Sequence, residues 1–295
     1  MVASSLLAMQ DDLLSVVTRL HTTEGQALHL LGRMLLTLAG STYAPIQPLI
    51  VTQCFTESDV QKVRDLVDEF IWAPGVTPVV TNYFNRSPGD YRTPLLNLGI
   101  STAAGRFITI LDYDDYVYEH AYETLINQLR QSPAGVAMGG CRVAYALPTA
   151  AGYKATSKDN PWAGKTLDDF LTDNIFPTVS YVIDRAKLPG QVPHITDQLT
   201  RVEDYELLLK LRAITTFDMT FFETPLCEYF IRRDGTTTSQ LGAEIDSSEN
   251  RHAWESARQM ISPLRASLQC LRGRPGDTLL TLTAPASGPA SASPA

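Results

Sequence analysis

Near its middle the sequence reads Arg106-Phe107-Ile108-Thr109-Ile110-Leu111-Asp112-Tyr113-Asp114-Asp115, an apolar run that ends in three carboxylates. A short continuous apolar run predicts a strand that is buried on both faces, as in a parallel sheet. In open α/β sheets, ligands bind outside the carboxyl ends of the strands. We therefore expect a binding site at residues 112–115.

The three carboxylates differ in the direction they face. In an extended chain, Asp112 and Asp114 point the same way and Asp115 points the other way. Two carboxylates about 4 Å apart repel by about 4 kcal/mol at an effective dielectric constant near 20. A hard cation with oxygen ligands, such as Mg²⁺ or Mn²⁺, removes that repulsion. The alternative is an acidic loop in water, which the acidic run alone favours because the repulsion there falls to about 1 kcal/mol.

Composition excludes several classes of protein. The 295 residues are enough for one large α/β domain or two small ones, and 44% hydrophobic with 19% charged residues exclude global disorder. A net charge of −8 argues against a nucleic-acid-binding surface, although a local basic patch for a phosphorylated ligand stays open. Four scattered cysteines indicate free thiols in a reducing compartment and no zinc site. With no membrane-spanning run and no secretory signal, we expect a cytoplasmic protein, with peripheral membrane association left open.

The first half of the chain alternates apolar strands with amphipathic helices. Strands are predicted over residues 13–20, 48–53, 76–81, 106–111 and 135–146, and helices over residues 26–38, 58–70, 95–105 and 118–131. This order implies right-handed crossovers and a doubly wound parallel sheet. The helix over residues 95–105 has many small residues, so we expect it to pack closely against the sheet.

The second half is less regular. Residues 147–165 are polar and read as a loop, and a strand is predicted over residues 176–183. Further on we expect a helix within residues 197–211, a strand or hairpin over residues 217–231, and a helix over residues 249–271 with a break near Pro263. Residues 1–12 read as a short leader or helix. The composition of residues 275–295, rich in Ala, Ser, Pro and Gly, predicts a disordered tail.

Three blocks of sequence resemble family 2 glycosyltransferases. In the first, Asn97-Leu98-Gly99, Ala104-Gly105-Arg106-Phe107-Ile108 and Leu111-Asp112-Tyr113-Asp114-Asp115 are similar to that family's N-x-G, A-x-G-x-(Y/F)-(I/L) and L-D-x-D-D motifs. In the second, Glu203-Asp204-Tyr205-Glu206-Leu207 is similar to its acceptor-side E-D motif. The third, Tyr229-Phe230-Ile231-Arg232-Arg233-Asp234-Gly235-Thr236-Thr237, resembles the Y-R-x-H/R-x-G-S-x-S stretch. The resemblance runs from about residue 13 to residue 238.

The resemblance implies a GT-A fold, with a Rossmann-like, mostly parallel central sheet and a smaller acceptor-side C-terminal part. It assigns residues 13–146 to the nucleotide-sugar (donor) half and residues 147–274 to the acceptor-side half of the same domain. The implied activity is inverting, metal-dependent transfer of a sugar from a nucleotide-sugar donor to the hydroxyl of a glycan or another acceptor, in glycan or polysaccharide biosynthesis. Transfer of a single sugar is expected, because the Q-x-x-R-W motif of processive synthases and a transmembrane region are missing from this sequence.

The resemblance also implies roles for particular residues. Asp112, Asp114 and Asp115 would contact the donor ribose and hold Mn²⁺ or Mg²⁺ on the diphosphate, whose growing negative charge a cation stabilises as it leaves. Asp204 would be the base that takes the acceptor proton, and Glu203 would orient the acceptor. If these acids begin a helix, its dipole would lower the pKa of Asp204. The alternative is a helix N-terminus that simply favours acids.

Further residues are candidates for donor contacts. Arg92 stands where the family often has a basic residue near the donor, and Arg232 or Arg233 could clamp the diphosphate through paired donors. Solvated surface arginines are the alternative for all three. Thr18, Arg19 and Gln53 stand where the family contacts the base, but its P-x-Y-N turn and D-x-x-S acid are replaced here, so the nucleoside is left open.

Two other functions remain as alternatives. One is a non-catalytic domain of the same fold that binds a sugar or a partner. The other is a sugar-nucleotide nucleotidyltransferase, which needs a Gly-rich loop after the first strand, whereas residues 21–25 contain a single glycine. The sequence names neither the sugar, the acceptor nor the linkage.

Overall fold

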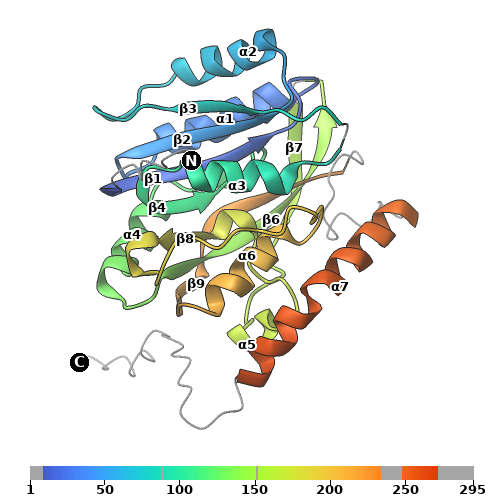
Figure 1. Ribbon diagram of the computed structural model, residues 1–295. Helices are drawn as coiled ribbons and strands as arrows, with labels where there is room; N and C mark the ends of the chain where they lie inside the picture. The colour runs from blue at the N-terminus through green and yellow to red at the C-terminus, as the bar shows by residue number, and fades with distance from the viewer. Residues whose placement is uncertain (1–8, 88, 151, 234–247, 272–295) are drawn as a thin grey trace, which may run out of the picture.

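The apolar runs and amphipathic stretches form one mixed sheet with helices on both faces in the computed structural model, which describes residues 9–87, 89–150, 152–233 and 248–271 (Figure 1). The strands are β1 (Gln10–Leu20), β2 (Ile46–Gln53), β3 (Val79–Tyr83), β4 (Gly105–Ile110), β5 (Tyr116–Val117), β6 (Val136–Thr149), β7 (Gly152–Asp159), β8 (Tyr181–Asp184) and β9 (Phe217–Arg232). The α-helices are α1 (Ala27–Ala39), α2 (Glu57–Asp68), α3 (Arg92–Thr102), α4 (Ala121–Gln131), α5 (Leu167–Phe170), α6 (Glu203–Arg212) and α7 (Ser248–Leu271). The predicted α/β class is confirmed.

The first half of the sheet is parallel, as the alternation of strands and helices predicts. β1 pairs in parallel with both β2 and β4, and β2 pairs in parallel with β3. Val17 of β1 lies opposite Leu49 of β2 on one side and Ile110 of β4 on the other. The carboxyl ends of these strands therefore meet at one edge of the sheet.

The second half of the sheet is mixed, so a mostly parallel sheet describes only the first half. The strands follow the order β3-β2-β1-β4-β8-β6-β9-β5, and β7 pairs with β6. β8 is antiparallel to β4 and β6, whereas β6 and β9 are parallel. Residues 147–165, predicted as a loop, contain the end of β6 and the whole of β7. β7 is mostly exposed, so backbone pairing rather than apolar burial forms it and its polar composition hides it.

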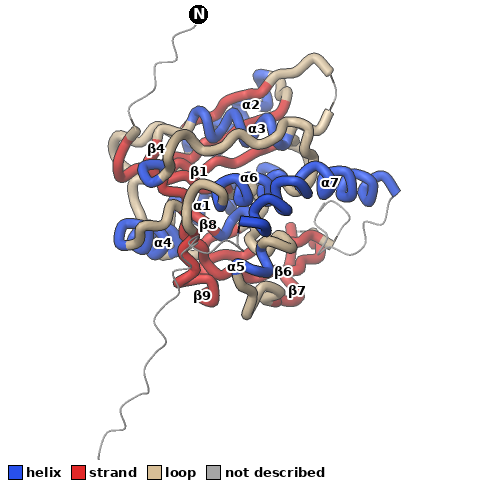
Figure 2. The backbone as a smooth tube through the Cα atoms, turned by 60° about the horizontal axis from the view of Figure 1, so that its bottom comes forward, coloured by secondary structure: helices blue, strands red, loops and turns tan. Residues whose placement is uncertain are grey.

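Helices cover both faces of the sheet and enclose two apolar cores (Figures 1 and 2). Leu14 and Val16 of β1 face a core built with α1, α2 and α4. Val17, the residue after Val16, faces a second core built with α3, α5, α6 and α7. The two-residue period of an extended strand thus assigns each side chain to one face.

Gly99 allows α3 to approach the sheet closely. A Cβ atom at Gly99 would lie 2.3 Å from Cγ1 of Val17, far inside van der Waals contact. The predicted close packing of this helix is therefore confirmed. The contact holds Arg92, the first residue of α3, near the ends of β1 and β2.

Several predicted boundaries are wrong for local reasons. β1 begins at Gln10, so the end of the predicted leader belongs to the sheet, held there by backbone bonds of exposed residues. α2 runs over Glu57–Asp68 and not over residues 58–70, because Thr56 caps it with a hydroxyl that accepts from the Asp59 amide. α7 continues through Pro263 without a break in the helix. The predicted tail over residues 275–295 lies outside the described residues, and among those described no helix combines the length and apolarity needed to cross a membrane.

Candidate active site

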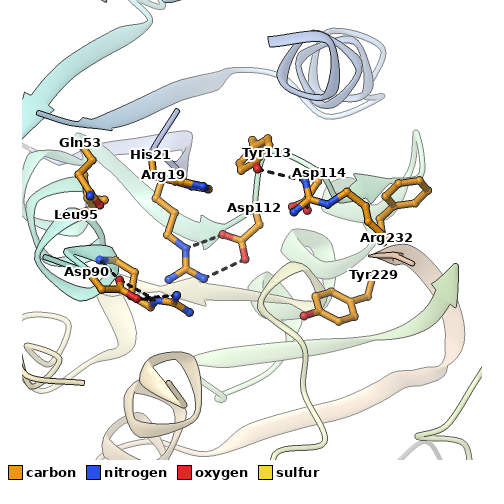
Figure 3. A pocket seen from close by; sticks show the side chains of 12 residues that line it. Arg19, His21, Gln53, Asp90, Leu95, Asp112, Tyr113, Asp114, Tyr229 and Arg232 are labelled. Atoms are coloured by element: carbon orange, nitrogen blue, oxygen red, sulfur yellow. Dashed lines mark hydrogen bonds and ion pairs between the residues drawn. The ribbon is translucent and has the colours of Figure 1, made fainter. Parts of the chain in front are cut away.

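Four separate elements deliver charged or polar side chains to one edge of the sheet (Figure 3). Arg19 lies near the end of β1, Gln53 ends β2, Asp112 follows β4 and Arg232 ends β9. Glu203 begins α6 and joins them through Arg19. The site therefore forms where ligand sites of open α/β sheets are expected.

Arg19 connects two carboxylates that are distant in the sequence. Its Nε donates to Asp112 Oδ1 at 2.9 Å and its Nη2 donates to Asp112 Oδ2 at 3.1 Å, a two-point contact. Its Nη1 donates to Glu203 Oε1. Burial acts to lower the pKa of Arg19, but the charges of Asp112 and Glu203 raise it well above its usual value. The guanidinium is thus held as a permanent cation between the two acids.

Strand alternation explains why Arg19 meets Asp112. Arg19 is two residues beyond Val17, and Asp112 is two residues beyond Ile110, its partner across β1 and β4. Both side chains therefore continue the face that carries the α3 and α6 core. The sequence departure from the family's first turn thus contributes a cation to the site.

Asp114 pairs with Arg232 on the opposite side of the cavity from Arg19 (Figure 3). Nη1 of Arg232 is 3.3 Å from Asp114 Oδ2 and donates to the Tyr113 hydroxyl at 3.2 Å. Burial raises the pKa of Asp114 to about 6, helped by the charge of Asp112 and opposed by that of Arg232. A further positive charge at Asp114 would stabilise its ionised form.

Asp115 does not face the cavity, which contradicts its predicted role as a ligand of the cation. Its side chain is 1% exposed, and Oδ1 accepts from the Phe230 backbone N–H at 2.8 Å. Oδ2 has no hydrogen-bond partner among the described residues. Burial, with the charges of Asp114 and Asp112, raises the pKa of Asp115 well above its usual value. Asp115 therefore ties the acidic loop to β9, while Asp112 and Asp114 face the ligand space, as the predicted alternation requires.

A first cavity of about 270 Å³ lies against these groups and is called the donor cavity here. Three arginines and three aspartates dominate its lining. The lining residues are Arg19, His21, Gln53, Asp90, Arg92, Leu95, Asp112, Tyr113, Asp114, Tyr229, Phe230 and Arg232. The predicted contacts Arg19, Gln53, Arg92, Asp112, Asp114 and Arg232 are thus brought together.

Two predicted donor contacts lie elsewhere because successive strand residues face opposite sides. Thr18 is fully buried toward the α1 side, and its hydroxyl has no partner among the described residues. The guanidinium of Arg233 lies over the ring of Tyr145, 4.6 Å from its centre, and Arg233 does not line the cavity. The structure contradicts both predictions.

A second cavity, of about 550 Å³, adjoins the first and is called the acceptor cavity here. It shares Arg19, Arg92, Asp112 and Tyr229 with the donor cavity. Its other lining residues are Trp162, Thr172, Asp173, Asn174, Pro177, Thr178, Arg201, Val202, Glu203, Asp204, Tyr205, Trp254, Arg258 and Arg265. The predicted base and its neighbour therefore face a space joined to the donor side.

Asp204 has a raised pKa, not the lowered one predicted from the helix dipole. Burial raises the pKa of Asp204 to about 6, the charge of Glu203 adds to the rise, and a hydrogen bond from Asn174 Nδ2 at 2.9 Å opposes it. Desolvation outweighs the helix N-terminus because the carboxylate is withdrawn from water. α6 also begins from strained backbone, since Val202 has a φ of 55°.

Residues outside the predicted set complete the site. Asp90 holds Arg92, with Nε 2.9 Å from Oδ1, and lies 3.6 Å from Arg201 Nη1. The spacing of Asp90 two residues before Arg92 was the available signal. Trp254 and the α7 arginines could not be found from the family blocks, because α7 lies beyond the last of them.

Asp112 and Asp114 are the carboxylates of the acidic run that line the donor cavity, and both oxygens of Asp112 also accept from Arg19. Among the described residues no cluster of three or more His, Cys, Asp or Glu side chains forms a metal site. One or two carboxylates completed by substrate phosphates is, however, an ordinary arrangement for Mg²⁺. The oxygen donors of Asp112 and Asp114 fit that arrangement.

The fold and the charged strand ends define a glycosyltransferase-type α/β domain. A model of the family described as "Glycosyl transferase family 2" matches residues 28–184, more than half of the chain. The chain therefore belongs to glycosyl transferase family 2, and the family predicted from the sequence is confirmed. The matched region contains Asp112 and Asp114 but ends before Glu203 and begins after Arg19.

Similar proteins agree with this assignment. "Glycosyltransferase GlyG" of Streptococcus pneumoniae serotype 4 is 49% identical over 43 residues, which are 15% of this chain and 14% of that protein. S. aureus TarS 1-349 in complex with UDP-GlcNAc has a TM-score of 0.53 at 10% identity, covering 90% of this chain and 77% of that one. Mannosyltransferase PcManGT from Pyrobaculum calidifontis, in complex with GDP-Man and Mn²⁺, has a TM-score of 0.50 at 12% identity, covering 90% and 76%. At 10% and 12% sequence identity, these structural similarities support the assignment of the fold alone.

Proposed function

We propose that this protein transfers a single sugar from a nucleotide-sugar donor to an acceptor hydroxyl, with inversion at the anomeric carbon and with a divalent cation. The observation that carries the proposal is the pair of adjoining cavities that share Arg19 and Asp112. One contains the carboxylates and arginines suited to a diphosphate, and the other contains a buried carboxylate suited to a base. The proposal includes a cytoplasmic location and a role in glycan or polysaccharide synthesis.

The donor cavity would bind the nucleoside diphosphate. Arg92 and Arg232 offer guanidinium groups, which pair with phosphate oxygens through two parallel donors. Asp114, with Asp112, would hold Mg²⁺ or Mn²⁺ against the diphosphate. When bound, that cation would neutralise charge on the leaving group. The raised pKa of Asp114 supports this role, since burial disfavours its charged form and a bound cation would favour that form.

The acceptor cavity would supply the base. The acceptor oxygen attacks the anomeric carbon, its proton passes to the Asp204 carboxylate, and the bond from that carbon to the diphosphate oxygen breaks. A single displacement of this kind inverts the anomeric centre. With a pKa of about 6, Asp204 is ionised at neutral pH and still basic enough to accept a proton.

Glu203 would position the acceptor and Arg19. Its carboxylate is buried and held by Arg19, so it is not free to rotate toward a substrate proton. The two halves of the domain also interleave, because Arg19 from residues 13–146 lines the acceptor cavity and Arg232 from residues 147–274 lines the donor cavity. We therefore propose the donor and acceptor halves as regions of a single functional domain.

A screen of UDP-, GDP- and dTDP-sugars tests the proposal. The purified chain is incubated with each donor and Mn²⁺, and nucleoside diphosphate release is measured with and without a panel of hydroxyl acceptors. We expect slow release with one nucleoside class, abolished in Asp204→Asn and in Asp114→Asn. Absence of binding to every nucleoside diphosphate, by calorimetry, would instead favour the non-catalytic alternative.

A further inference from the structure

Two of the three tryptophans of this chain, Trp162 and Trp254, line the acceptor cavity. The third, Trp72, lines neither cavity and packs against the core that is built with α1, α2 and α4. Tyr205 and Tyr229 add two further aromatic side chains to the lining. Aromatic walls with a few polar groups are typical of a binding site for an organic ligand, and a volume of about 550 Å³ is large enough for one.

Trp162 is held in place by the loop that connects β7 to α5 (Figure 1). Its backbone N–H donates to Asn160 Oδ1 at 3.3 Å, and its carbonyl accepts from the Lys165 N–H at 3.1 Å. The Gly164 N–H donates to Glu223 Oε1 of β9 at 2.9 Å, which fixes the loop to the sheet. Trp162 is partly exposed and packs against both apolar cores. A ring held in this way loses little conformational freedom when a ligand covers it, so it suits a binding platform.

Tyr229 places Trp162 beside the junction of the two cavities. The centres of the two rings are 6.5 Å apart and their planes meet at 63°, an edge-on contact. Tyr229 lines both cavities, and Glu203 and Asp204 line the same cavity as Trp162. On the proposed function, the bond to the anomeric carbon forms at this junction. A sugar ring that covers Trp162 is therefore the one whose hydroxyl reacts.

Several charged side chains of the acceptor cavity are already partnered within the protein. Arg19 holds two of the carboxylates on the lining. Nη2 of Arg201 donates to Asn250 Oδ1 at 2.9 Å, and Arg265 donates a hydrogen bond to Tyr205. A charged ligand that bound to these groups would have to replace partly buried hydrogen bonds, which costs free energy. The lining therefore favours an uncharged ligand that leaves these pairs intact.

We propose that the acceptor is an uncharged saccharide and that the apolar face of its reacting sugar ring stacks on Trp162. The inference rests on the proposed function and deepens it by naming the class of acceptor and a residue that binds it. A pyranose presents C–H groups on its face, and their partial positive charge is attracted to the negative face of an aromatic ring. The hydroxyls at the edge of the sugar stay available, and one of them faces Asp204. Trp162 takes no part in bond making.

The test is ¹⁹F NMR of the full chain labelled with 5-fluorotryptophan, in the presence of a saturating nucleoside diphosphate and Mn²⁺. The three tryptophans give three signals, and Trp162→Phe identifies the signal of Trp162. The probes are the methyl glycosides of glucose, galactose, mannose and N-acetylglucosamine, with glucose 6-phosphate as a charged ring and sorbitol as an open-chain polyol. We expect at least one methyl glycoside to shift the Trp162 signal in a saturable way and to leave the Trp72 signal in place. Sorbitol should shift neither signal, and glucose 6-phosphate should bind no more tightly than methyl glucoside.

Variants at Trp162 make the test specific. Trp162→Ala should weaken binding of that methyl glycoside about tenfold or more, and Trp162→Phe, which keeps an aromatic face, should weaken it less. Ligand-observed NMR titration measures both affinities. Trp72→Ala is the matched control and should leave the affinity unchanged, because Trp72 lines neither cavity. Retained binding of the nucleoside diphosphate shows that each variant is folded, and if Trp162→Ala does not fold, the ¹⁹F measurement on the unsubstituted chain still decides.

Three results overturn the inference while the nucleoside diphosphate binds. No methyl glycoside binds, or one binds without shifting the Trp162 signal, or Trp162→Ala and Trp72→Ala lose affinity equally. Tighter binding of glucose 6-phosphate than of methyl glucoside contradicts the uncharged acceptor. If the nucleoside diphosphate itself does not bind, the proposed function fails and this inference fails with it.

Discussion

Nε of Arg19 lies 2.9 Å from Oδ1 of Asp112, although 93 positions separate the two residues in the sequence. Arg19 lies in the stretch where the family resemblance leads one to expect a P-x-Y-N turn. It pairs with an acid of the donor cavity and continues, through Nη1, to Glu203 of the acceptor cavity. A single guanidinium therefore holds the two cavities at a fixed spacing.

Replacing Arg19 tests that role. In Arg19→Gln, Asp112 and Glu203 lose their shared cation while Glu203 stays buried, so we expect the free energy of unfolding to fall by about 3 kcal/mol. Arg19→Lys keeps the charge but not the planar two-point contact, so its loss should be smaller. Urea denaturation measures both. The control is Arg64→Gln, since Arg64 forms an exposed pair with Glu57 and should change stability by less than about 1 kcal/mol.

The pKa of Asp204 should determine how the rate of the proposed reaction falls at low pH. A base must be deprotonated, so with a pKa of about 6 the rate at saturating donor should be level above that pH and fall about tenfold per unit below it. Asp204→Asn should lower the rate by about 10²–10⁴-fold while donor binding stays nearly intact. A pH profile of initial rates, with calorimetry of the donor, checks both expectations. Near-normal turnover in the variant would make Asp204 a structural acid and would contradict its role as the base.

Substitutions of Asp114 and of its neighbour Asp115 should have different effects on the Mn²⁺-dependent binding of a nucleoside diphosphate. Asp114→Asn removes a carboxylate that lines the donor cavity, so we expect the Mn²⁺-dependent part of nucleoside diphosphate binding to be lost. Asp115→Asn alters a buried side chain behind the cavity and should leave most of that binding. Calorimetry with Mn²⁺ and with EDTA measures the difference. If the unmodified chain binds the nucleoside diphosphate equally well with Mn²⁺ and with EDTA, the assignment of the cation to Asp114 is refuted.

The close packing of α3 predicts a stability difference between two glycines. Gly99→Ala places a methyl group 2.3 Å from Cγ1 of Val17, so α3 must shift and the free energy of unfolding should fall by about 1–3 kcal/mol. Gly32→Ala is the control on α1, where the nearest atom, Leu66 Cδ1, is 3.4 Å away. There the better helix propensity of alanine should offset or exceed any packing loss. Thermal unfolding of both variants decides the matter. An unchanged melting temperature in Gly99→Ala would show that α3 can move freely.

The parallel half of the fold was predictable because its strands are apolar on both faces and alternate with amphipathic helices. The β6–β7 hairpin was not, since β7 is polar and is held by backbone pairing that composition does not reveal. Strand alternation also predicted that Asp115 faces away from Asp112 and Asp114. We nevertheless counted it with the ligands, because the family motif groups the three aspartates.

Two parts of the candidate site were predictable because they lie at strand ends. Arg232 belongs to a block that resembles the family, and Arg19 stands where the sequence departs from the family's turn. The predictions for Thr18 and Arg233 were wrong by one position. A shift of one position places a strand residue on the opposite face. The pKa of Asp204 depends on burial, which a helix start in the sequence does not disclose. Trp254, Arg258 and Arg265 of α7 line the acceptor cavity, although α7 is far along the chain from the family blocks, so their place in the site was not predictable.

The lining shared by the two cavities has a consequence for the order of binding events. Arg19, Arg92, Asp112 and Tyr229 touch both spaces, so a molecule in one cavity forms part of the wall of the other. On the proposed function, the two substrates cannot then bind as independent partners, and each dissociation constant depends on the presence of the other ligand. Steady-state kinetics should accordingly follow a sequential scheme through a ternary complex. The affinity of an acceptor measured alone would understate its affinity during turnover.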